Sequence, residues 1–92
     1  MDTPKNLTLP TIHLNGTSAT SLFEGNARAM GAIRKAIKTL EDNAPHSRDY
    51  YVQNNPEQAF LKASTEHMER IKKLQDVLTE MYALAEHVSD KA

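Results

Sequence analysis

The chain has 92 residues, 39% of them hydrophobic, and a formal net charge of −1 from 11 basic and 12 acidic side chains. This length allows one domain, residues 1–92, and the near-zero charge removes the bulk attraction on which sequence-independent DNA binding depends. No cysteine is present, which excludes disulfides and thiolate metal sites, and no apolar run reaches the length of a signal or membrane segment, so we expect no membrane partner.

Residues 1–16 are predicted to form an extended arm. Pro4 and Pro10 prevent a continuous helix, and an Asn-Gly turn signal ends at Gly16. The apolar residues of the arm nearly alternate with polar ones: Leu7, Leu9, Ile12 and Leu14. One edge of the arm is therefore expected to lie on a hydrophobic surface of helices from about Leu9 onward.

A first helix is predicted over residues 17–43. Ser21 and Glu24 have the spacing of a capping box, whereas Thr17 or Ser18 as the cap would begin the helix a turn earlier, and we favour the earlier start. Apolar and small residues then recur at helical spacing on one face: Leu22, Asn26, Ala29, Met30, Ile33, Ala36, Ile37 and Leu40. That face is expected to be buried.

An ordered loop over residues 44–55 is predicted to lead into a second helix over residues 56–88. Asn55 is the expected N-cap, and Pro56 suits the first helical position. The second helix has a regular heptad seam: Phe60, Ser64, His67, Ile71, Leu74, Leu78, Met81, Ala85 and Val88. Such spacing favours packing against another helix.

The predicted fold class is all-α, an extended N-terminal arm plus an antiparallel two-helix hairpin. Because the second helix is longer, we expect its C-terminal end to lack a partner; the apolar residues there are Val77, Tyr82, Leu84 and Val88. Two helices cannot enclose a core unaided, so we expect a homo-oligomer, a dimer or higher, assembled through the heptad seam.

Three strings carry a resemblance to a known family: His13-Leu14-Asn15-Gly16-Thr17-Ser18, Arg48-Asp49-Tyr50-Tyr51, and Glu66-His67 followed by Arg70. Over about residues 11 to 88 the chain resembles small, largely uncharacterised proteins of tailed bacteriophages, although His46-Ser47 replaces the Asn-Gly of the family's middle string. The resemblance implies a viral origin and a place in the host cytoplasm, and it supplies no catalytic residue. In size, helicity and expected oligomerisation the chain is also similar, more loosely, to the phage anti-defence proteins called nucleotide sponges, which sequester the nucleotide messengers of bacterial immunity.

Each string has a ligand-binding interpretation and a simpler structural one. The helix start at Gly16 and Thr17 offers backbone N–H groups to an anion, or is only a turn and cap. Arg48 beside two tyrosines suits a nucleotide, or it secures the loop. His67 on an apolar seam donates to a ligand or to a structural partner. The candidate ligand-binding residues are His13, Asn15, Gly16, Thr17, Ser18, Arg48, Tyr50, Tyr51, His67 and Arg70.

Metal binding and catalysis have little support in the sequence. The four histidines are scattered without metal-ligand spacing: His13, His46, His67 and His87. No nucleophile with a base and an acid can be named, and no glycine-rich nucleotide loop is present. We therefore expect no enzyme, no metal and no cofactor.

The preferred functional hypothesis is a non-enzymatic phage protein that binds and sequesters a nucleotide-like immune messenger, such as a cyclic nucleotide or an ADP-ribose derivative. Because an antiparallel hairpin places the two ends of the first helix far apart, the Gly16 and Arg48 strings could meet only across two subunits. The alternative hypothesis is a structural or regulatory adaptor that binds a host or virion protein and needs no small-molecule pocket.

Overall fold

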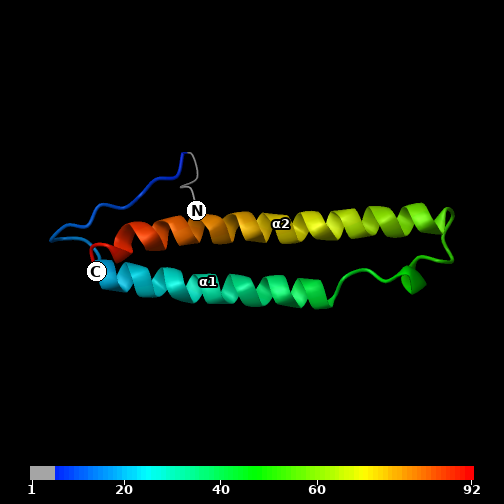
Figure 1. Ribbon diagram of the computed structural model, residues 1–92, viewed down its shortest axis with the longest axis horizontal. Coiled ribbons are helices and arrows are strands. Elements are labelled where there is room, and N and C mark those ends of the chain that lie inside the picture. Colours follow the sequence, from blue (N-terminus) through cyan, green and yellow to red (C-terminus); the bar gives the residue numbers. More distant parts are fainter. Residues whose placement is uncertain (1–5) are drawn as a thin grey trace.

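The computed structural model describes residues 6–92, which form an antiparallel pair of long helices (Figure 1). Helix α1 spans Ala19–Asp42, a single 3-10 turn η1 spans Ser47–Asp49, and helix α2 spans Pro56–Ser89. No strand occurs between residues 6 and 92. The all-helical hairpin is confirmed, and the molecule is a rod of 62 × 23 × 20 Å.

The first turn of α1 is capped by Ser18. Its Oγ accepts a hydrogen bond of 3.1 Å from the backbone N–H of Ser21, while its own backbone is extended (φ −64°, ψ 152°). This geometry is the usual one for a serine N-cap, because the side chain satisfies an amide that has no partner within the helix. The earlier of the two predicted starts is confirmed, and α1 begins at Ala19.

Helix α2 begins with Pro56 at its first position, but the expected side-chain cap from Asn55 is wrong. Asn55 has a left-handed backbone (φ 54°, ψ 59°) and its side chain makes no capping hydrogen bond. An N-cap side chain reaches the first amides from an extended backbone, which Asn55 does not have. Only its carbonyl takes part, accepting from the N–H of Ala59 at 3.0 Å.

The core is thin and lies along the contact between α1 and α2. Among residues 6–92, five apolar residues are buried: Ala19, Met30, Ile37, Ala85 and Val88. Each of the nine residues of the predicted heptad seam of α2 is buried or half-buried, and the seam follows this contact from His67 onward. The predicted stripe of α1 is buried or half-buried as well, except for Ala36, which is exposed.

The uncovered end of α2 is its beginning, and the expectation that its C-terminal end lacks a partner is wrong. Val88 is completely buried, whereas Leu61 near the start of α2 is 67% exposed. The last turn of α1 meets α2 at His67, so the turns of α2 before that residue extend past α1 (Figure 1). Tyr50 packs there against Phe60, with ring centroids 6.2 Å apart, because the long loop returns over this end.

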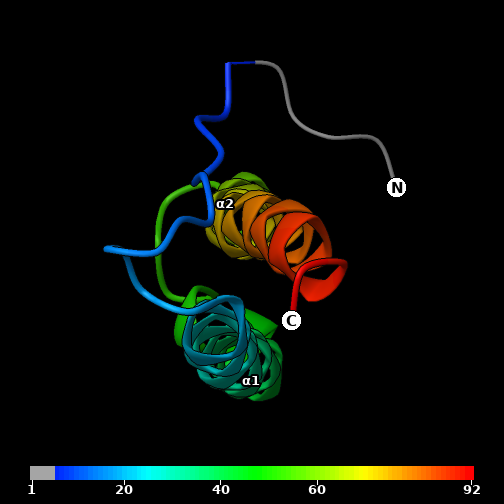
Figure 2. The same ribbon diagram turned by 90° about the vertical axis from the view of Figure 1, so that its left-hand side faces the viewer.

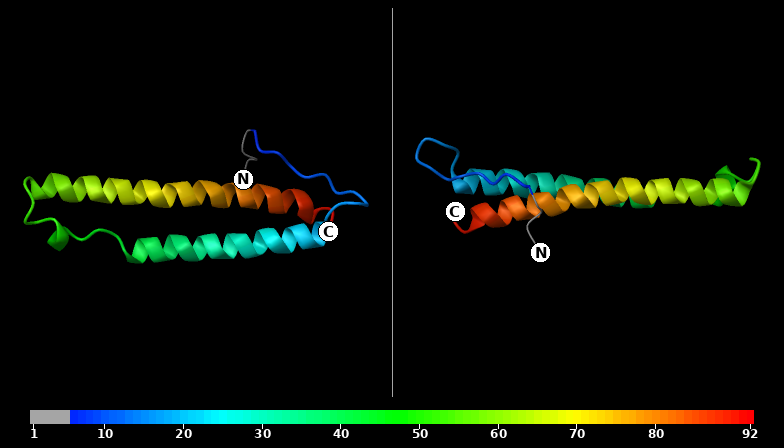
Figure 3. Two further views of the ribbon diagram at one scale, coloured as in Figure 1. Left: turned by 180° about the vertical axis from the view of Figure 1, so that it is seen from behind. Right: turned by 90° about the horizontal axis from the view of Figure 1, so that it is seen from above.

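The arm lies beside the C-terminal half of α2 (Figures 2 and 3). Nε2 of His87 donates a hydrogen bond of 2.8 Å to the carbonyl of Pro10, and Ile12 is half-buried. The expected docking is confirmed for this part of the arm. It is wrong for Leu14, which is 98% exposed because the turn closed by the Gly16 N–H and the His13 carbonyl (3.1 Å) carries it outward.

Over residues 6–92, neither helix is both long enough and apolar enough to cross a lipid bilayer.

Replacing the N-cap tests this account of the start of α1. Ser18→Ala should lower the free energy of unfolding by about 1 kcal/mol, since it leaves the Ser21 amide without its partner. Ser21→Ala is the matched control, and it should change stability by less than about 0.5 kcal/mol because no hydrogen bond of the Ser21 hydroxyl is lost. Urea unfolding followed by circular dichroism measures both; equal effects would place the cap elsewhere.

Candidate functional site

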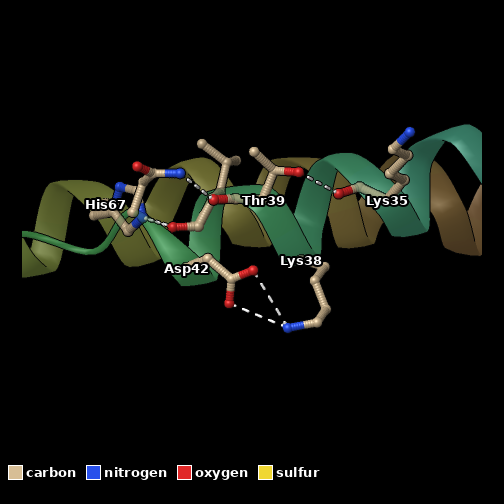
Figure 4. Close-up of polar contacts among 7 residues, drawn as sticks. Lys35, Lys38, Thr39, Asp42 and His67 are labelled. Atoms are coloured by element: carbon tan, nitrogen blue, oxygen red, sulfur yellow. Dashed lines mark hydrogen bonds and ion pairs between the residues drawn. The ribbon is translucent and has the colours of Figure 1, made fainter.

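The buried histidine of the seam is a link between the two helices. His67 is 7% exposed, and its Nε2 lies 2.5 Å from the carbonyl oxygen of Leu40 in the last turn of α1 (Figure 4). A carbonyl oxygen only accepts, so Nε2 carries the proton and donates. The imidazole therefore satisfies a C-terminal carbonyl of α1 that has no N–H partner four residues ahead in the helix.

Neighbouring groups complete the same helix end (Figure 4). The Leu40 carbonyl also accepts from the N–H of Asn43 at 3.1 Å, and Nδ2 of Asn43 donates to the Thr39 carbonyl at 2.8 Å. Lys38 pairs with Asp42 at 3.1 Å on the exposed side. These contacts explain why a polar residue occupies the seam: His67 faces the negative end of the α1 dipole, where a leucine would leave a carbonyl less well satisfied.

The loop string is organised by His46, a residue that the sequence analysis did not assign to this task. Nδ1 of His46 accepts a hydrogen bond of 3.0 Å from the backbone N–H of Arg48 and thereby caps η1. Tyr50 is half-buried against Phe60, whereas Tyr51 is 70% exposed. Arg48 is exposed too. One tyrosine is thus held by packing, and Arg48 and Tyr51 remain accessible to a ligand.

The string at the start of α1 is already engaged in local contacts. The Gly16 N–H bonds the His13 carbonyl at 3.1 Å, and the Ser18 hydroxyl caps α1. A Cβ added at Gly16 would lie 2.7 Å from Nε2 of His13, so the exposed ring of His13 would have to turn away to admit one. Asn15 and Thr17 are exposed. The turn-and-cap interpretation accounts for most of the donors here.

The structure does not bring the candidate residues together within one chain. His13 to Ser18 precede α1 at one end of the rod, and Arg48 to Tyr51 lie beyond the other end of α1 (Figure 1). His67 lies between them and faces α1, while Arg70 is exposed. A pocket shared by these groups would require a second subunit, as the length of α1 already indicated.

Sequence reasoning missed three other features. Nη2 of Arg34 donates a hydrogen bond to the hydroxyl of Tyr82, and the guanidinium lies 5.3 Å from the centre of that ring, so this pair joins α1 to α2. Leu61 and Met68 stay 67% and 70% exposed. The signal for the latter two was available, because they are seven residues apart on α2 and outside the seam.

Among residues 6–92, no three histidine or acidic side chains gather closely enough to hold a metal ion. Comparison with known proteins does not add a relative: no protein-family model matches the chain, and no curated protein or solved structure does so either.

The role of His67 can be separated from ligand binding by a stability measurement. His67→Leu should lower the free energy of unfolding by about 1 kcal/mol, because the imidazole hydrogen bond to the α1 terminus is lost while apolar volume is kept. Arg70→Leu, an exposed position one turn later, should stay within about 0.5 kcal/mol of the wild type. If His67→Leu were as stable as the wild type, the imidazole would be free for another task.

Proposed function

We propose that this protein is a non-enzymatic helical adaptor of phage origin that binds a host or virion protein through exposed surfaces of its helices. The observation that carries the proposal is the placement of large apolar side chains outside the core. On both helices such residues remain exposed: Phe23, Leu61, Met68, Val77 and Tyr82. Exposed apolar groups gathered on a small protein are typical of surfaces that bind other proteins.

One of these surfaces is a groove between α1 and α2 near the Ser89 end. It is lined by Phe23 and Met30 from α1 and by Tyr82, Ala85, Glu86 and Ser89 from α2. The wall is mainly apolar, and two aromatic rings border it. Aromatic residues at the rim of a hydrophobic groove are common anchors for a helix or loop of a partner protein. The hypothesis of a viral origin rests on the resemblance of the three sequence strings.

A comparison of captured proteins tests the adaptor proposal. Tagged wild-type protein, expressed during infection and cross-linked, should recover a host or virion protein that Phe23→Ser recovers about tenfold less, because truncating an aromatic anchor costs that much affinity or more. Val52→Ser is the matched control, since Val52 is 78% exposed at the opposite end. Circular dichroism verifies that all three chains are equally helical. Identical recovery by the three chains would contradict the proposal.

A second candidate function, sequestration of a nucleotide-like messenger, is favoured by one observation. Arg48 and Tyr51 are both exposed on the turn that His46 fixes. A guanidinium binds phosphate oxygens in a bidentate manner, and an exposed ring stacks on a base. In this proposal Thr17 of another subunit and Arg70, which are exposed, would complete the pocket, since Gly16 and His67 already form hydrogen bonds within their own chain.

Thermal unfolding tests the messenger proposal directly. Cyclic dinucleotides, cyclic trinucleotides and ADP-ribose would be tested one at a time, and a true ligand at a hundred times its Kd should stabilise the wild type by about 2.7 kcal/mol. Arg48→Gln should abolish the stabilisation, whereas Arg28→Gln on the exposed side of α1 should retain it. The absence of any stabilisation across the set would exclude these ligand classes.

A further inference from the structure

One surface of α2 is apolar at its centre and has no partner among residues 6–92. Leu61 and Met68 are 67% and 70% exposed and lie two helical turns apart on the same side of α2, with Thr65 between them. Two adjoining grooves run along this side, and both are bordered by Thr65 and Glu69. We call this surface the Leu61 face; its residues are Leu61, Lys62, Thr65, Met68 and Glu69.

We propose that the Leu61 face binds the same face of a second copy of this chain, with the two α2 helices antiparallel and a two-fold axis at Thr65. This inference deepens the proposed function, because it supplies the interface of an oligomeric adaptor. A two-fold axis at Thr65 places Leu61 of each copy against Met68 of the other, since the two residues are nearly equidistant from it. The two apolar side chains thus cover each other twice.

The charges on the Leu61 face fit only this orientation. Lys62 and Glu69 are also seven residues apart, and they lie on one flank of the line from Leu61 to Met68. In an antiparallel pair the same flanks meet, so Lys62 of one copy faces Glu69 of the other, twice. In a parallel pair opposite flanks meet, so Lys62 and Glu69 of one copy would lie away from Lys62 and Glu69 of the other and would gain no ion pair.

Lys62 and Glu69 are free to make these contacts. Over residues 6–92 the ion pairs are Lys38 with Asp42 and Lys72 with Asp76, and neither pair includes them. Lys72, which also lies beside the apolar line, is neutralised by Asp76 at 2.6 Å. Lys62 has Glu66 and Glu69 has Lys73 four residues ahead on α2, but neither pair is within ion-pair distance, so both charges can reach a second copy.

The solvent-accessible surface of the chain is larger than that of a compact monomer of the same mass. The chain exposes 6988 Å², whereas a compact monomer of 10.3 kDa exposes about 5,400 Å². This excess is spread over a rod of 62 × 23 × 20 Å and its arm, and an ordinary interface buries about 800 Å² on each partner, so a second copy would contact more of α2 than the five residues of the Leu61 face. From His67 onward the heptad seam is not free for the purpose, because this part of α2 lies along the contact with α1. The start of α2, which α1 leaves uncovered, is the region where a second copy can approach.

Such a dimer would have two ends for partner proteins. The groove beside Phe23 and Tyr82 lies about 30 Å from Thr65 along α2, so two copies would present their grooves about 60 Å apart. The same arrangement leaves Arg48 of one copy about 30 Å along the axis from Gly16 of the other, because Tyr50 packs at Phe60, about 8 Å from Thr65, whereas Gly16 precedes α1 near the far end of α2. It therefore suits a bivalent adaptor and does not assemble the nucleotide pocket.

Charge reversal tests the antiparallel pairing. In sedimentation equilibrium on the full chain, the wild type should form dimers, and Lys62→Glu or Glu69→Lys alone should raise the dimer Kd about tenfold by placing like charges opposite each other twice. The double variant Lys62→Glu with Glu69→Lys should restore the wild-type Kd, and the two single variants mixed together should form a heterodimer. Lys35→Glu makes the same change of charge on the exposed side of α1 and should leave the Kd unchanged.

Three outcomes would overturn the inference. The first is a chain that stays monomeric up to about 500 µM, which is above the micromolar Kd expected of a small interface. The second is a dimer that still forms in Leu61→Asp. The third is a double charge-reversal variant whose dimer Kd is as high as that of the single variants. Circular dichroism would show that each variant is folded. The adaptor proposal is tested by a different measurement, the capture of a partner protein by the wild type and by Phe23→Ser. A monomeric chain would therefore contradict the dimer without contradicting the adaptor function.

Discussion

The unequal length of two paired helices is the constraint on which this structure depends. Helix α2 has 34 residues and α1 has 24, so about 15 Å of α2 cannot lie beside α1. The register of the pair decides which end is left over. Because Ala85 and Val88 pack beside the start of α1, the excess falls at the beginning of α2. The long loop, with η1 and Tyr50, covers part of that segment, and Leu61 and Met68 remain exposed.

Register is supported by polar contacts as much as by the apolar seam. The five buried apolar residues of the described chain include two alanines and a valine, and side chains this small do little to fix how far one helix is shifted along the other. The hydrogen bond from His67 to the end of α1 and the pairing of Arg34 with Tyr82 occur at defined positions along both helices. A shift by one turn would break both contacts, so a polar group on the seam provides specificity that the apolar contacts lack.

The same contacts decide what remains available for function. His67, His46 and His87 each satisfy a backbone group, at the end of α1, in η1 and in the arm respectively. The Gly16 turn and the Ser18 cap use the donors and acceptors of the first string. Many groups of the polar strings that suggested a ligand site therefore cap helices, close turns or join the two helices. The groups that have no such structural role are Arg48, Tyr51 and the exposed apolar side chains, and these groups are available to bind a ligand or a partner protein.

The sequence by itself determined the elements of this protein. Helical periodicity predicted the two helices. The hydroxyl side chains before Ala19 marked the start of α1, and Pro56 marked the start of α2, because such signals act within a few residues of the chain. The heptad spacing likewise identified the buried face of α2. Only the tertiary structure decided the register of the helices, the partner of His67 and the uncovered end of α2, since these depend on residues 27 or more positions apart whose pairing no local pattern encodes. The exposed pair Leu61 and Met68 lies between the two cases: its spacing and its position outside the seam are visible in the sequence, but whether the arm or the loop covers it is decided by segments far away in the chain.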